Sequence, residues 1–254
     1  MKKLTLSVLA LATVASFTAC KKGEEDPSLS LSSRKARLAG EWKVQSKDET
    51  ITSKSTSAGV TSTYTSKDTW TATTAKEEKS SQQAGSSITT TTTKEGSVTT
   101  NTYSIKKDGT WSSVQLYTLK STSNNGKTVK EELYDIKKSG NWNFLGKNDP
   151  TTKKKQVVDF TVLKYDEVMT TTETTTLNGQ TFTDKNVETQ GIVFKTGESI
   201  MQWNLLRLAN KEIKVITSSD NSSTGSNAST SGSTTTTTSS TVTNVTSGAM
   251  TLKQ

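Results

Sequence analysis

Histidine is absent from the 254 residues of this chain, and cysteine occurs once, at Cys20. Without histidine, the chain cannot supply a Ser-His-Asp triad, a histidine-ligated metal or a histidine general base. A single cysteine excludes an internal disulfide, so an exported body would have to be stable without one. Covalent modification of Cys20 would also remove thiol catalysis and cysteine zinc sites. The prediction is a protein that is not an enzyme and uses no cofactor and no metal.

The carboxylates form no catalytic pattern either. Adjacent residues of a strand point to opposite faces, so neither Glu131-Glu132 nor Asp166-Glu167 can converge on one substrate. We expect these side chains to be solvated charges. A glycosidase that uses two distant carboxylates is the remaining enzymatic alternative. Glycines stand singly at predicted turns, and none belongs to a phosphate-binding loop.

Hydrophobic residues make up only 29% of the chain, and the two prolines, Pro27 and Pro150, stand at apparent joints. Serine and threonine dominate instead, and threonine favours strands because its branched Cβ suits a pleated, half-exposed surface. The formal charge of +8 falls to +6 when Lys2 and Lys3 are removed with a leader. This excess is spread along the chain. It indicates a soluble surface, or attraction to acidic glycans and lipid headgroups, and no nucleic-acid partner.

The first 19 residues have the pattern of a secretory signal peptide. A positive start at Lys2 and Lys3 precedes an apolar run that is too short and too polar to span a membrane. The alternative is an N-terminal core helix. An ordinary cleavage site requires a small residue at the position of Phe17, whereas Ala19-Cys20 suits cleavage before a lipidated cysteine. This stretch resembles the lipobox of bacterial lipoproteins, which implies a diacylglycerol and a further acyl chain such as palmitate on Cys20.

A charged run follows the cysteine within a predicted flexible tether over 20–36. It resembles the acidic export tag of surface lipoproteins of Bacteroidota; the alternative is a merely solvated tether. The residue after Cys20 is not the aspartate that retains lipoproteins in the inner membrane of enteric bacteria. We therefore predict a protein anchored by lipid in the outer membrane, facing either the cell surface or the periplasm. The predicted export-signal residues are Lys21, Lys22, Glu24, Glu25 and Asp26.

The body, 37–254, is predicted to consist of strands after a short helical turn capped by Ser32 or Ser33. In the first strand, Trp42, Val44 and Ser46 share one face, which predicts one buried and one wet side. The expected strands cover 41–46, 61–74, 88–94, 98–105, 113–121, 128–136, 157–175, 181–194, 200–208, 213–217 and a last strand around Met250 and Leu252. The segments 76–86 and 218–240 are predicted to be polar turns or loops, the second with a Thr-rich strand extension.

Two segments repeat the same pattern at equal offsets: Tyr103-Ser-Ile-Lys-Lys-Asp-Gly-Thr-Trp111 and Tyr134-Asp-Ile-Lys-Lys-Ser-Gly-Asn-Trp142. Each is predicted to be a hairpin. A two-residue Asp-Gly turn would separate Trp111 from the face of Tyr103 and Ile105. A three-residue loop with left-handed Gly109 places all three aromatic and apolar side chains together, so we favour it. The same argument places Trp142 opposite Ile136.

These antiparallel strands follow one another in sequence order, which favours one closed up-and-down β-barrel of eight to ten strands, because closure protects sheet edges. The opening Gly40-Glu41-Trp42 resembles the first strand of lipocalins. The chain is similar to lipocalin-like lipoproteins of Bacteroidota in this motif, in the hairpin over 103–111, in the Gly-x-Trp at 140–142 and in the late segment 203–208. The resemblance implies that Trp42 plugs the closed end of a barrel and that Arg207 packs over it.

The candidate residues of the barrel interior or of a ligand site follow from strand alternation. Core packing is the simpler interpretation, and contact with an apolar ligand or a sugar at the barrel mouth is the functional one. Trp70, among polar neighbours, is predicted to be partly exposed. The candidates are Trp42, Tyr103, Trp111, Tyr134, Trp142, Met201, Trp203 and Arg207.

Two functions are compatible with these observations. The first is a monomeric, non-catalytic lipoprotein that binds a small apolar ligand, a glycan or a surface partner. The second is a structural or adhesive surface lipoprotein with a filled barrel and no small ligand. A cavity lined by Trp111, Trp142 and Met201 would favour the first; a filled interior with long Thr-rich hairpins would favour the second.

Overall fold

A computed structural model of the chain describes residues 33–57, 60–83, 86, 89–123, 125–145, 157–231 and 234–254, with backbone only for 218–242 and 244. The predicted signal peptide, Cys20, the export-signal residues and the connection at 147–155 lie outside the described residues. One short helix and eleven strands make up the described part. The elements are α2 (Arg34–Leu38), β1 (Gly40–Ser57), β2 (Val60–Thr71), β3 (Thr74–Gln82), β4 (Thr89–Ile105), β5 (Thr110–Ser123), β6 (Thr128–Phe144), β7 (Val157–Leu177), β8 (Gln180–Val193), β9 (Ile200–Leu208), β10 (Glu212–Ser231) and β11 (Thr234–Lys253).

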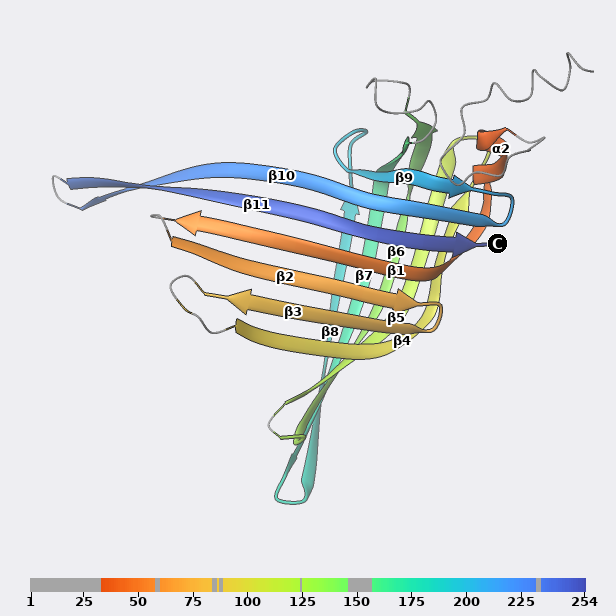
Figure 1. Ribbon diagram of the computed structural model, residues 1–254. Coiled ribbons are helices and arrows are strands. Elements are labelled where there is room, and N and C mark those ends of the chain that lie inside the picture. The colour runs from red at the N-terminus through yellow and green to blue at the C-terminus, as the bar shows by residue number, and fades with distance from the viewer. Residues whose placement is uncertain are drawn as a thin grey trace, which may run out of the picture.

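The strands form a closed antiparallel ten-stranded barrel, as predicted (Figure 1). Strands that follow one another in sequence are mostly neighbours, and the pairing of β6 with β7 closes the ring. β8 is the additional strand: it turns back along β7 as a hairpin, and β9 then pairs with the first residues of β7. The helical turn α2, capped by the Ser33 side chain as expected, lies over the closed end.

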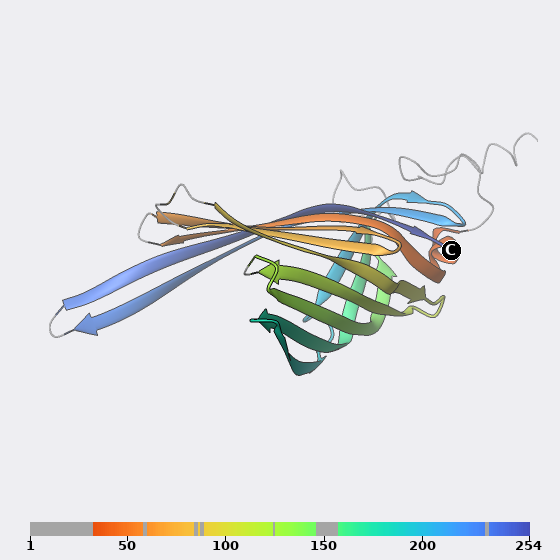
Figure 2. The same cartoon turned by 90° about the horizontal axis from the view of Figure 1, so that it is seen from below.

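The barrel has a closed base and two open arms (Figure 2). At the base, Gly40–Lys43 of β1 pair directly with Thr102–Ile105 of β4, so the hairpin β2–β3 is bypassed there. Beyond the base, β4 and β5 separate after the pair Glu95–Lys120, and β10 is paired with β9 only at 213–216. The sheet therefore divides into a six-stranded arm, the outer parts of β10, β11 and β1–β4, and a four-stranded arm, the outer parts of β5–β8.

The hairpin between β4 and β5 has the three-residue loop that the sequence predicts. Ile105 pairs with Trp111, and the amide of Lys106 donates to the Thr110 carbonyl at 2.9 Å. Gly109 has a φ of 96°, a conformation that glycine adopts without steric cost. The predicted turns at Asn125-Gly126 and Asn178-Gly179 are also confirmed, with positive φ at all four residues.

The second copy of the repeated pattern is not a hairpin, and that prediction is wrong. β6 runs unbroken from Thr128 to Phe144, and Trp142 pairs with Phe160 rather than Ile136. Gly140 does not form a turn; it allows the backbones of β6 and β7 to approach each other closely. A Cβ at this position would lie 1.9 Å from the carbonyl oxygen of Thr161 on β7. The same Gly-x-Trp pattern thus has two structural roles.

Three further predictions differ from the structure. The polar segment 76–86 is mostly strand β3, and the two strands predicted around Gly96 are one strand, β4. The segment 218–240 is not a loop, because β10 and β11 remain paired as far as Ser231 and Thr234. In each case neighbouring strands satisfy the backbone hydrogen bonds of a polar segment, so strand formation does not require a buried apolar face.

Register shifts separate the base from the arms in β1, β4 and β7, and one more lies within the base in β9. They leave one extra residue at 45 in β1, 99 in β4, 163 in β7 and 206 in β9. Each extra residue exchanges the face that points inward. In β1 the next inward-facing residue after Trp42 and Val44 is therefore Lys47. Ser46, which was predicted to share their face, is exposed.

Candidate functional site

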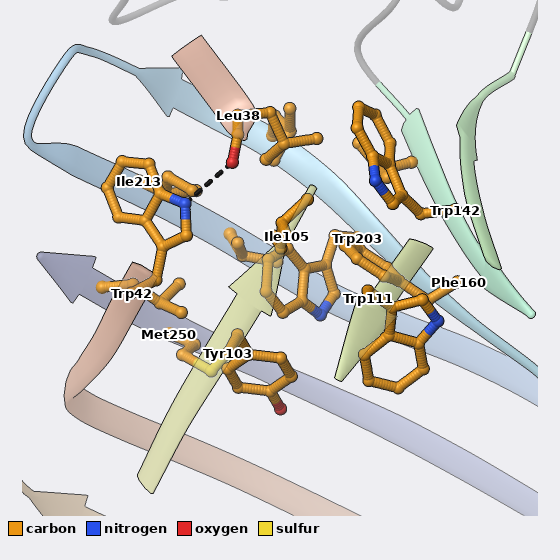
Figure 3. Close-up of a cluster of buried hydrophobic side chains, with 14 of the residues drawn as sticks. Leu38, Trp42, Tyr103, Ile105, Trp111, Trp142, Phe160, Trp203, Ile213 and Met250 are labelled. Carbon is orange, nitrogen blue, oxygen red and sulfur yellow. Dashed lines mark hydrogen bonds between the residues drawn. The ribbon is translucent and has the colours of Figure 1, made fainter. Parts of the chain in front are cut away.

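The base of the barrel is filled by the four tryptophans that were predicted to point inward (Figure 3): Trp42, Trp111, Trp142 and Trp203. Trp42 is 1% exposed, and its indole N–H donates to the Leu38 carbonyl of α2 at 2.8 Å. Arg37, also buried, donates from Nη1 to the Leu208 carbonyl. Together these bonds hold α2 against the strands at the closed end of the barrel, where Trp42 is buried. Buried neighbours of the base are Val44, Ile105, Val158, Val162, Leu205, Ile213, Val215, Met250 and Leu252.

Three further tryptophans pack in the same cluster. The ring centroids of Trp203 and Phe160 are 4.5 Å apart, and Trp111 meets Phe160 edge-on at 5.2 Å. Trp111 donates its N–H to the Thr161 carbonyl at 3.2 Å, and Trp142 donates to the Lys106 carbonyl at 2.8 Å. Rings at these distances occupy the volume that a ligand would need.

The other candidate residues have different surroundings. Tyr103 is buried with its ring edge-on to Trp203 at 5.0 Å, and burial raises its pKa to about 12. Met201 is partly buried against the base. Arg207 differs from the prediction: the extra residue at 206 turns it away from the face of Trp203 and Leu205, and its Nε lies 2.8 Å from Glu212 Oε2.

A second cluster joins the two arms just above the base. We call Trp70, Lys94, Tyr117, Glu132 and Tyr134 the junction cluster. Trp70 and Tyr117 have ring centroids 4.5 Å apart, and Tyr117 stacks on Tyr134 at 4.8 Å. Trp70 is 7% exposed, so the prediction of partial exposure is wrong. It is wrong because Trp70 belongs to the six-stranded arm and is covered by a tyrosine of the four-stranded arm, a contact between strands far apart in sequence.

Glu132 is the buried charge of the junction cluster, with 5% of its side chain exposed. Its carboxylate lies 2.6 Å from Lys94 Nζ and 2.9 Å from Lys130 Nζ, and Tyr134 donates to it at 2.9 Å. Burial would raise the pKa of Glu132. The bonds from these three donors outweigh burial and lower the pKa to about 2. Glu131 points outward to Lys120 at 2.6 Å, so the predicted separation of this carboxylate pair is confirmed. The prediction that both side chains are solvated is wrong for Glu132, which faces the interior of the barrel.

Charged side chains continue along the inner faces of both arms. Lys47 is 2.8 Å from Glu49 and 3.5 Å from Asp68, and it lies over the Trp70 ring. Lys138 lies 5.3 Å from the centre of the Tyr165 ring, and burial together with the charge of Lys47 lowers its pKa. The interior above the base is thus polar, and most of the charges named here are paired with one another, with Lys138 the exception.

Part of the junction cluster could be predicted from the sequence. Glu132 shares the period-two face of Tyr134 and Ile136, which points inward, so its burial follows from alternation. Its partner Lys94 is 38 residues away, and no local pattern identifies it. Nowhere in the described part of the chain do three or more aspartate, glutamate, cysteine or histidine side chains gather so as to hold a metal ion. No helix within the described residues is long and apolar enough to cross a membrane.

Comparisons with protein-family models, with curated proteins and with solved structures give no match. A function for this chain must therefore be inferred from its own sequence, fold and side-chain geometry.

Proposed function

We propose that this chain is a lipid-anchored, non-catalytic surface protein. A side-chain-filled barrel base, held at the outer membrane through Cys20, presents two Thr-rich arms for contact with a partner. The observation that carries this proposal is the packing of the tryptophans. Trp111, Trp142 and Trp203, the rings that could have lined a ligand cavity, are all buried and pack against aromatic neighbours.

The arms supply the second support. They contain long paired strands whose side chains, where described, are largely exposed, as in β8 and in the threonine-rich outer part of β4. Strands of this kind contribute little apolar burial, so the closed base must supply most of the stability. Exposed side chains on projecting strands are available for contact with other macromolecules.

The membrane part of the proposal rests on residues 1–26, which resemble the leader, lipobox and export tag of Bacteroidota surface lipoproteins. The Cys20→Ser variant tests it. We expect this variant to leave the membrane fraction, because no acyl chain can be attached. Protease digestion of intact cells then distinguishes the two leaflets: loss of the arms indicates the cell surface, and protection indicates the periplasmic face.

A small ligand is the second candidate, and one observation favours it. Within the described residues Lys138 has no carboxylate at ion-pair distance; its neighbour is the Tyr165 ring. The anionic group of a ligand would compensate this half-buried charge.

Native mass spectrometry of the mature protein, extracted gently from its own envelope, separates the two candidates. We expect only the mass of the chain and its covalent lipid. An additional molecule that leaves on denaturation would contradict the filled-barrel proposal and would identify the ligand. The Lys138→Met variant is the matched control, because loss of that molecule in this variant would place it beside Lys138.

A further inference from the structure

The six-stranded arm ends in an unpaired strand edge. β10 pairs with β9 over 213–216 and with β11 along its whole length, so residues 217–231 are paired on one side only among the described strands. Along such an edge every second residue directs its N–H and C=O away from the sheet. Fifteen residues of open edge are long for a protein that stays unassociated.

The edge of β10 lacks the features that normally prevent strand addition. Between 217 and 231 there is no proline and no lysine, and Asp220 is the only charged residue. The neighbouring stretch of β11, 234–248, has no charged residue at all. Charges and prolines are the usual means by which edge strands avoid pairing with another chain.

The other long free edge provides an internal comparison. β8 pairs only with β7 among the described strands, but it carries Asp184, Lys185 and Glu188 within fourteen residues. Two-fold pairing of β8 with itself about residue 184, 185 or 188 would oppose identical charges, and pairing about 186 would oppose Asp184 and Glu188. The charges of β8 thus disfavour four of the six two-fold registers centred on residues 184–189.

The sequence of the β10 edge is nearly a palindrome about Thr224: Thr-Ser-Ser-Asp-Asn-Ser-Ser-Thr-Gly-Ser-Asn-Ala-Ser-Thr-Ser. A two-fold antiparallel pair aligned over all of 217–231 therefore joins like with like except at two positions, Asp220 with Ala228 and Ser223 with Gly225. Asn221 meets Asn227, serine and threonine meet one another, and the single charge, Asp220, meets Ala228. Hydroxyl and amide pairs across strands are favourable, and no like charges oppose each other.

We propose that two copies of this chain associate through the β10 edges. The strands pair antiparallel about a two-fold axis at Thr224, which makes one continuous sheet from two six-stranded arms. This inference rests on the proposed function and deepens it by naming the partner of one arm. The two proposals can fail independently, because finding that the chain is monomeric would not change the native mass spectrometry result expected for a filled base.

The first test compares two lysine variants of the mature lipoprotein in detergent. Thr224 and Thr241 are register partners at the same height of the hairpin, but Thr241 lies on the inner strand β11, between β10 and β1. By sedimentation velocity, we expect dimers for the wild type and for Thr241→Lys. Thr224→Lys should associate at least tenfold more weakly, because two lysines would face each other on the axis. Unchanged tryptophan fluorescence will show that the base is folded in each.

The second test introduces a cysteine on the axis. In the Thr224→Cys variant the two introduced thiols would lie on directly opposed residues, whose Cα atoms are about 4.5–5.5 Å apart in an antiparallel pair, within disulfide range. We expect a crosslinked dimer on mild oxidation, and none for Thr241→Cys. A monomeric wild type, equal effects of both lysine variants, or equal crosslinking at both positions would overturn the proposal. Open-ended species that grow with concentration would also overturn it, since they indicate head-to-tail pairing with another edge.

Discussion

The base and the arms of this barrel are built from the same strands, yet they differ in what the alternate residues contribute. In β7, Val158, Phe160 and Val162 are buried in the base, whereas the threonines from 170 onward are partly or fully exposed. Pairing of β7 with β6 continues through both regions, with one register shift at residue 163. The comparison indicates that pairing extends a sheet, while side-chain burial in the base stabilises it.

The largest difference should follow from truncating the base. Trp203→Ala removes a ring that is 1% exposed and that contacts Phe160 and Tyr103. We expect a loss of about 3–5 kcal/mol in the free energy of unfolding, from lost burial and a residual cavity. Phe182→Ala in β8, where the side chain is 56% exposed, should change it by less than about 0.5 kcal/mol. Urea unfolding measures both; similar losses would contradict the division into base and arms.

Glycine substitutions test the same comparison through steric clash of a new Cβ rather than through lost burial. In Gly140→Ala the new Cβ would meet the Thr161 carbonyl oxygen at 1.9 Å, so β6 and β7 must separate. We expect a loss of about 1–3 kcal/mol, as for overpacked cores. Gly191→Ala, in the four-stranded arm, meets no atom closer than 3.6 Å and should be nearly neutral. Thermal unfolding followed by circular dichroism will show whether the two variants differ.

The boundary between base and arms can be tested at Glu132. Glu132→Gln removes a charge bonded to Lys94 and Lys130, and we expect a loss of about 1–3 kcal/mol at pH 7. The pKa of Glu132 is lowered from 4.5 to about 2, so its stabilising contribution is present above pH 4.5 and disappears as the pH falls towards 2.

The stability difference between wild type and Glu132→Gln should therefore narrow across that range. Glu131→Gln is the matched control, because Glu131 is half exposed and its ion-pair partner among the described residues is the exposed Lys120. A constant difference from pH 7 to pH 2 would contradict the assignment.

The smallest effect is expected from shortening the six-stranded arm. Replacing 220–245 with Asn-Gly joins Ser219 to Thr246, which are register partners, by a two-residue hairpin turn. Unfolding followed by tryptophan fluorescence should change by less than about 1 kcal/mol, since no residue of the base is removed. A larger loss would show that the arm stabilises the base. The same variant should no longer dimerise.

Much of the fold was predictable because it depends on local chemistry. The three-residue loop at 107–109 and the turns at Asn125-Gly126 and Asn178-Gly179 follow from backbone preferences of the residues themselves. The inward position of Trp42, Trp111 and Trp203 follows from alternation within a strand. The barrel follows from strands in sequence order that require closed edges.

The rest depended on contacts between distant segments. The extra residues at 45, 99, 163 and 206 change which face points inward, and they reflect the curvature of the closed barrel rather than any local pattern. For this reason Arg207 and Ser46 lie outside, and Lys47 lies inside.

The sequence by itself determined that the chain forms strands, where most of them turn, and which aromatic residues are available for a core. These properties depend on backbone preferences and on a period of two, which act within a few residues. Only the tertiary structure decided that Gly140 lies in a strand and that Trp70 is buried. It also decided that Lys94 neutralises Glu132. Each of these depends on a strand distant in sequence, brought close by closure of the barrel.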